Sequence, residues 1–306
     1  MTSETDSLVR AAAFAFLEEQ RQIHGELLPY SILIAGFQFQ GTRVPLVGPQ
    51  GIFKPKVLDD MPLSIATAPP VSGRPAPYDD TFEEDGVLRY RYRGQDPQHH
   101  DNVGLRLAMT RRAPLVYLHG IAKGTYLAAW PVYVVGDDPP ALTFRVEVDD
   151  SRTLTSGVAD ASGPEVEGRR RYVTAVVLRR MHQASFRERI LEAYRSQCAV
   201  CRLRHRELLD AAHIIPDSHE RGDPSVQNGL SLCKLHHAAF DGHFFGVRPD
   251  FVIDVRPSIL REHDGPMLQH GLKEIHGLKI ELPRREILRP SQDRLQERYE
   301  IFMKAG

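Results

Sequence analysis

The side chains best suited to chemistry are gathered in one short stretch, residues 198–243. All three cysteines of the 306-residue chain lie there, beside several of its histidines. Cys198 and Cys201 form a pair with two residues between them, and Cys233 and His236 form a second pair of the same spacing. Two such pairs can wrap a single zinc ion tetrahedrally. We therefore expect a Cys3His zinc site, which has no open ligand position and would be structural.

Further residues inside and beside this stretch could hydrolyse a phosphodiester. His213 lies in the apolar run DAAHII, Asn228 lies in QNGL, and His237 directly follows the second pair. A histidine with a pKa near ~6.5 can act as a general base at neutral pH. His237 and Asp241 are four residues apart, so on a helix they would share a face and suit one divalent ion.

The order of these residues resembles the HNH endonuclease family over roughly residues 185–255. The resemblance implies a ββα-metal core of two strands and a helix, and a divalent ion such as Mg²⁺ or Mn²⁺. It implies that His213 is the general base that activates water, and that His237 is a metal-ligating histidine. Asn228 would orient the loop and the base or assist at the metal. Asp241 lies where many members have a second ligand.

One position departs from the family pattern. The residue before the base is often an Asp or His that binds the metal, and here it is Ala212, which cannot ligate. Asp210 could replace it only if the backbone turns its side chain inward. His236 and His237 could also exchange roles, although the spacing favours His236 on zinc. The departure leaves open a non-catalytic DNA-binding protein in which the zinc core is only a scaffold.

The remaining sequence predicts the elements that must hold this site. Residues 1–24 predict an amphipathic helix, and residues 289–305 predict a closing helix. Residues 185–197 predict a helix capped by Ser185, with apolar side chains four residues apart. Short apolar runs in residues 28–150 are separated by turn residues, as expected of a barrel or compact sheet. Residues 149–171 are polar and contain Gly and Ser, which predicts a linker.

Several short elements in residues 28–150 resemble the SRA (YDG) domain. They are GIFKP (51–55), PYDDTFEEDG (77–86), YRG (92–94) and DNVGLRLAM (101–109). The resemblance implies a PUA-like β-barrel that flips 5-methylcytosine out of duplex DNA into a pocket. A finger at 95–101 would fill the gap left in the duplex.

Such a pocket needs an aromatic ring to stack on the base and polar groups for its Watson–Crick edge. Six residues are candidates for it: Tyr78, Asp79, Asp80, Tyr92, Arg93 and Gly94. The two tyrosines could sandwich the base, and one of the two aspartates could accept from the N4 amine of cytosine. The backbone of the Arg-Gly turn could contact the other edge.

Charge and composition place limits on partners and compartment. Residues 165–205 carry ten arginines against four glutamates, so this basic strip beside the metal cluster could follow DNA phosphates. No apolar run approaches the ~20 residues of a membrane span, and the N-terminal residues lack the features of a signal peptide. We expect a cytoplasmic protein with reduced thiols and no membrane partner.

Together these features predict an α+β chain. Its expected parts are an N-terminal helix (1–24), an SRA/PUA-like β-barrel domain (25–150), a linker region (151–184), and a ββα-metal HNH domain with a zinc knuckle (185–306). The expected function is a modification-dependent, type IV-like restriction endonuclease acting on double-stranded DNA that contains 5-methylcytosine. One HNH site cuts one strand, so a homodimer is expected. The alternative mark is 5-hydroxymethylcytosine or phosphorothioate, or the enzyme reads unmodified DNA.

Overall fold

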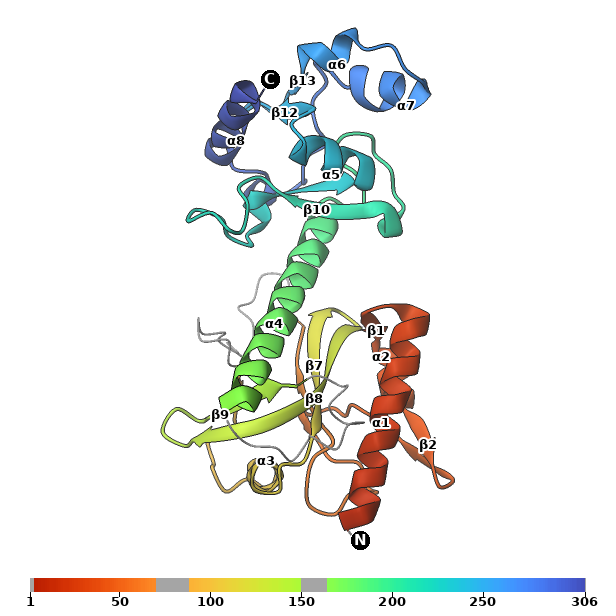
Figure 1. Ribbon diagram of the computed structural model, residues 1–306, viewed down its shortest axis with the longest axis vertical. Helices are drawn as coiled ribbons and strands as arrows, with labels where there is room; N and C mark the ends of the chain where they lie inside the picture. The colour runs from red at the N-terminus through yellow and green to blue at the C-terminus, as the bar shows by residue number, and fades with distance from the viewer. Residues whose placement is uncertain (1–2, 70–87, 150–163, 306) are drawn as a thin grey trace. The chain divides into compact units, whose positions relative to one another are not determined.

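The computed structural model describes residues 3–69, 88–149 and 164–305 (Figure 1). It divides into two compact units, Met1–Met181 and His182–Gly306, which we describe separately. The prediction of a mixed α+β protein is confirmed. None of the helices in the described ranges is long and apolar enough to span a membrane.

The boundary between the units falls inside one long helix, α4 (Pro164–Ala193). The helix predicted for residues 185–197 is therefore the end of a longer one. Ser185 lies inside α4 and does not cap its start, and residues 164–184 are helical although a linker was predicted there. The polar composition misled the prediction because arginine and glutamate are good helix formers.

A curled seven-stranded sheet forms the body of the first unit (Figure 1). Its strands follow the order β4-β5-β7-β8-β9-β6, with β1 paired to β8; β5 and β7 are parallel and the other pairs antiparallel. The hydroxyl of Tyr90 on β6 donates to the carbonyl of Ala66 on β5 at 3.2 Å. The ends of the described strand order therefore approach each other, although no strand pairing closes them into a barrel. The strands are β1 (Leu27–Pro29), β4 (Ile52–Phe53), β5 (Ser64–Thr67), β6 (Leu88–Arg91), β7 (Leu115–Ala122), β8 (Thr125–Asp138) and β9 (Thr143–Val148).

The N-terminal helix α1 (Ser3–His24) covers part of this sheet, at the place where the sequence predicts a helix. Its side chains Val9, Ala13 and Leu17 recur every four residues and are buried in the same core as Val116 and Leu118 of β7. The burial of this stripe holds the helix on the sheet. The unit is completed by α2 (Tyr30–Ala35), a hairpin of β2 (Phe37–Phe39) and β3 (Thr42–Val44), and α3 (His100–Thr110).

The second unit contains the expected two strands and a helix. β10 (Leu209–His213) pairs antiparallel with β11 (Gly229–Cys233), and α5 (Lys234–Asp241) follows directly. Phe186 and Ile190 from the end of α4 belong to the same core. A hairpin of β12 (Phe245–Val247) and β13 (Ile253–Val255), short helices α6 (Pro257–Arg261) and α7 (Pro266–Leu268), a π turn (Gln269–Lys273) and the closing helix α8 (Gln292–Lys304) complete the unit. Ser291 caps α8.

Candidate active site

The structure brings together the four side chains predicted to bind zinc. The ligand atoms of Cys198, Cys201, Cys233 and His236 all lie within 4.8 Å of one another. The sulfurs of Cys201 and Cys233 are 3.9 Å apart, and His236 Nδ1 lies 3.6 Å from Cys198 Sγ and 3.1 Å from Cys233 Sγ. A tetrahedral zinc with ~2.3 Å bonds to sulfur separates its sulfurs by about 3.8 Å. The four groups therefore fit one metal ion.

The surroundings of the cluster prepare its ligands. Nε2 of His236 lies 2.7 Å from the carbonyl of Gly271, to which it can donate its hydrogen. This tautomer leaves the lone pair of Nδ1 directed at the sulfurs, as in metal sites whose histidine is held by an outer partner. Hydrogen bonds among the thiols lower the pKa of Cys198 and raise that of Cys201. One thiolate is therefore favoured without metal, and a bound metal would displace the remaining thiol protons.

A second group of polar side chains lines an open pocket of about 570 Å³ in the same unit. Three of the predicted site residues lie on its wall, namely His213, His237 and Asp241. His213 ends β10, and the other two come from α5. The full lining is Gln183, Phe186, Arg187, Asp210, Ala211, His213, Pro216, Asp217, His237, Asp241 and Arg298.

The ring of His213 is held by α4. Phe186 stacks on it with ring centroids 4.0 Å apart and an angle of 12° between the planes. The register partner of His213 is Gly229, where a Cβ would lie 2.3 Å from Ile190 Cδ1 and 2.7 Å from Phe186 Cζ. Only glycine lets α4 approach this closely. Burial lowers the pKa of His213, against the opposing charge of Asp217, so the imidazole is neutral at pH 7.

Asn228 supports the loop after His213 and does not line the pocket. Its side chain is fully buried. Oδ1 accepts from the backbone N–H of Ile215, and Nδ2 donates to the carbonyls of Ile215 and Asp223, each at 2.9 Å. Of the two roles considered for this residue, these contacts fit the orientation of the loop and the base.

His237 lies between two carboxylates. Its Nε2 is 3.3 Å from Asp241 Oδ2, and its Nδ1 is 3.7 Å from Asp210 Oδ2. The hydrogen bond with Asp241 raises the pKa of His237 and lowers that of Asp241. The two carboxylates face different nitrogens of the ring. An ion bound to one nitrogen of His237 would therefore have only one of the two carboxylates as its second ligand. Either pair gives one nitrogen and one oxygen ligand, which leaves positions for water and phosphate oxygens.

The departure at Ala212 has a structural counterpart. Ala212 is fully buried, whereas Asp210 lines the pocket. Strict alternation along a strand would place these two residues on the same face. Along β10, however, Leu209 and Ala212 are buried while the other three residues are partly exposed. The strand thus presents a carboxylate to the pocket two residues before Ala212.

The proposed base pocket is only partly within the described residues. Tyr78, Asp79 and Asp80 lie outside them. Tyr92 is 3% exposed, and its ring stacks on Phe144 with centroids 4.5 Å apart. Its hydroxyl donates to Asp137 and accepts from Arg106. This is the environment of a core side chain, because the ring is covered and its polar group is satisfied.

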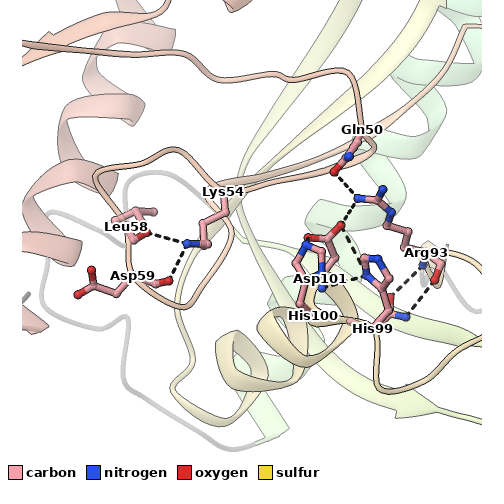
Figure 2. Close-up of polar contacts among 9 residues, drawn as sticks. Gln50, Lys54, Leu58, Asp59, Arg93, His99, His100 and Asp101 are labelled. Carbon is pink, nitrogen blue, oxygen red and sulfur yellow. Dashed lines mark hydrogen bonds and ion pairs between the residues drawn. The ribbon is translucent and has the colours of Figure 1, made fainter.

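The turn at Arg93 and Gly94 is fixed to the start of α3 (Figure 2). The backbone N–H of Arg93 donates to Asn102 Oδ1 at 2.9 Å, and the guanidinium binds Asp101 at 2.5 Å. His100 Nε2 lies 3.1 Å from the same carboxylate. His99, His100 and Asp101 also bring three ligand atoms within 4.8 Å of one another. These side chains already have partners within the protein. His99 caps α3, and Asp101 contacts both His100 and Arg93.

Several arginines of the predicted basic strip are paired inside the protein. Arg169 and Arg170 both bind the fully buried carboxylate of Asp149, at 3.0 and 2.8 Å. Arg180 pairs with Glu26 at 3.1 Å. Arg169 and Arg170 thus neutralise a buried carboxylate of the first unit, whereas Arg180 forms an exposed pair that contributes little to stability. With these partners the strip offers fewer free charges to phosphates than its composition predicts.

Sequence reasoning missed several residues that line the pocket, among them Phe186 and Arg298. Phe186 belongs to the apolar positions predicted for the helix at 185–197, and Arg298 lies in the closing helix, more than fifty residues beyond the last predicted site residue. The arginine does leave a signal, since it occupies the same helix face as Leu295 and Phe302. A charge on an apolar stripe marks a position worth examining.

Comparison with known proteins finds a family match within the second unit. Residues 198–248 match the model of a family described as HNH endonuclease. No match was found among curated proteins. Among solved structures, the chain is similar to a "Modification dependent TagI restriction endonuclease" at 16% sequence identity, covering 79% of this chain and 82% of that one, with a TM-score of 0.30.

The matched segment contains both pairs of the metal cluster, Asn228 and the pocket residues from Asp210 to Asp241. Its two strands and helix are those observed as β10, β11 and α5. HNH endonucleases use a divalent metal ion and act on DNA. The second unit therefore contains a segment that matches the HNH endonuclease family, and this match supports an HNH-type DNA endonuclease.

Proposed function

We propose that this chain is a modification-dependent endonuclease in which the first unit recognises 5-methylcytosine and the second hydrolyses a nearby phosphodiester. The observation that carries the nuclease half is the pocket that joins His213, His237 and two carboxylates within a segment matching the HNH family. The resemblance of residues 28–150 to SRA domains supports the reader half, with a PUA-like barrel that flips the base.

In this proposal His213 removes a proton from the attacking water. Its Nε2 is buried, so we assign Nδ1 as the nitrogen that accepts the proton from water. Stacking on Phe186 fixes the plane of the ring, and Asn228 fixes the loop that follows it. A base held in the reactive geometry lowers the entropic cost of reaching the transition state.

His237 with Asp241, or His237 with Asp210, would hold the divalent ion, Mg²⁺ or Mn²⁺. When bound, the ion would offset negative charge on the scissile phosphate and the leaving oxygen. The Cys3His cluster would hold zinc with no open position and would brace β11 and α5. Because Cys233 and His236 flank the start of α5, this zinc would also position His237.

The buried state of Tyr92 favours a second candidate for the reader. A base sandwich needs two exposed rings, and Tyr92 is stacked inside the unit. The first unit would then read another mark, such as 5-hydroxymethylcytosine or a phosphorothioate, or bind DNA without regard to modification. In either case the turn at Arg93 and Gly94, held by Asn102, remains a candidate for DNA contact.

The nuclease half is tested with His213→Ala and a matched control. His205→Ala removes an exposed histidine of the same unit outside the pocket. We expect His213→Ala to abolish cutting of plasmid DNA while its affinity for the same DNA is kept, and His205→Ala to cut as the unaltered protein does. A His213→Ala protein that still cuts would remove the assigned base.

A further inference from the structure

We propose that Arg298 is a positioning residue that orients the Asp241 carboxylate for the catalytic metal ion, an inference that rests on the function proposed above. Arg298 belongs to α8, beyond residues 198–248 that match the family. Its side chain nevertheless lines the pocket together with His237 and Asp241.

Arg298 stands where the packing of α8 suits an apolar side chain. Leu295, Arg298 and Phe302 share one helix face, with exposed fractions of 0%, 9% and 6%. This face lies close against β12, where a Cβ on Gly246 would be 2.6 Å from Phe302 Cδ1. A charge placed in such a face lowers stability unless it is paired and hydrogen-bonded.

The hydrogen bonding of Arg298 is incomplete. Nη2 donates to the carbonyl of Phe240 at 3.3 Å, and the guanidinium lies 4.9 Å from the centroid of the Phe240 ring. Nε is buried and has no hydrogen-bond partner among the described residues. Replacement of a buried ion pair by apolar residues of similar volume is often neutral or stabilising, so a buried charge is weak evidence for a role in fold stability. The neighbour of Arg298 in the pocket offers another reason for the charge.

That neighbour is Asp241, whose two oxygens have different partners. Oδ1 lies 3.7 Å from Arg298 Nη2, and Oδ2 lies 3.3 Å from His237 Nε2. The carboxylate is thus held between a cation from α8 and a histidine of its own helix. Its side chain is still 59% exposed, so it remains open to a further ligand. Carboxylates that bind metals are commonly oriented by such outer partners.

The test measures Mn²⁺ binding to the full chain with its zinc cluster loaded and without DNA, by the loss of the free-ion electron paramagnetic resonance signal. We expect Arg298→Met to weaken Mn²⁺ binding about tenfold, and Arg298→Lys, which keeps the charge, to recover most of the affinity. Arg248→Met removes an exposed arginine paired with Asp250 outside the pocket and should bind as the unaltered protein does. Thermal melting establishes that each variant folds, and Arg298→Gln replaces Arg298→Met if the latter does not.

A double-mutant cycle separates positioning from a general effect. Asp241→Asn alone should weaken Mn²⁺ binding, and Arg298→Met added to it should cause no further loss. Unchanged affinity in Arg298→Met, or an equal tenfold loss in the Asp241→Asn background, would overturn the inference while leaving the proposed function intact. An unaltered protein that binds no Mn²⁺ beyond its zinc cluster would overturn the catalytic metal site itself and this inference with it.

Discussion

The burial and ring contact of His213 suit the role of general base proposed for it. Because burial lowers its pKa, the imidazole stays neutral to a pH below the ordinary value of ~6.5. We expect the single-turnover cleavage rate to fall as the pH drops through this lowered pKa. The acidic midpoint of the pH–rate profile, where the rate is half of its maximum, should therefore lie below ~6.5. Measured rates that already fall above ~6.5 would contradict the assignment.

Phe186 supplies part of that burial through its stack on His213. In Phe186→Leu, the smaller side chain admits water to the ring, and the pKa of His213 should rise toward its ordinary value. The acidic midpoint of the pH profile should therefore move up in this variant. The exposed residue Gln296 of α8 gives a control, since Gln296→Ala should leave the midpoint unchanged. A midpoint that stays fixed in Phe186→Leu would show that the stack does not set it.

Tyr92 offers a residue-scale test of the reader. Tyr92→Phe keeps an aromatic ring but removes the hydroxyl that contacts Asp137 and Arg106. If the side chain is part of the core, the free energy of unfolding should fall by about 1 kcal/mol, with affinity for methylated DNA unchanged. Chemical denaturation and duplex binding give the two readouts. Weaker binding at unchanged stability would instead restore Tyr92 to the base pocket.

The proposed zinc cluster would brace the elements around it. Cys198 and Cys201 lie in the loop between α4 and β10, while Cys233 and His236 flank the start of α5. Cys201→Ala should lose bound zinc and unfold the second unit at a lower temperature, because the segment loses its crosslink. Zinc content and thermal melting test this. His219→Ala, an exposed histidine outside the cluster, should keep both, and normal zinc content in Cys201→Ala would refute the ligand assignment.

At the same scale, α4 shows how a helix can be underestimated. The polar sequence around Arg169 and Arg170 predicts a linker. In the structure, however, these two side chains neutralise the buried carboxylate of Asp149. A tertiary partner thus stabilises a helix turn that lacks its own apolar stripe. Local sequence patterns report the intrinsic helix preference of a segment. They cannot report the stabilising effect of Asp149, because this residue is about twenty positions away in the chain.

Across the whole molecule, sequence patterns predicted those contacts that are set by short spacings along the chain. Paired ligand spacing predicted the cluster at Cys198 and His236, and the four-residue spacing of His237 and Asp241 predicted their contact. Arg298 and the turn of Asp210 into the pocket could not be predicted, because they depend on how α8 packs and how β10 twists. The stacking of Tyr92 on Phe144 likewise needed the strand order of the sheet.

The most direct test of the whole account compares one plasmid in cytosine-methylated and unmethylated forms, incubated with the purified chain and Mn²⁺, Mg²⁺ or EDTA. We expect cutting of the methylated plasmid alone, its arrest by EDTA, and no cutting of either plasmid by His213→Ala. Equal cutting of both forms would contradict the 5-methylcytosine reader and leave the nuclease. Cutting that persists in EDTA or in His213→Ala would contradict the metal and base at the centre of the account.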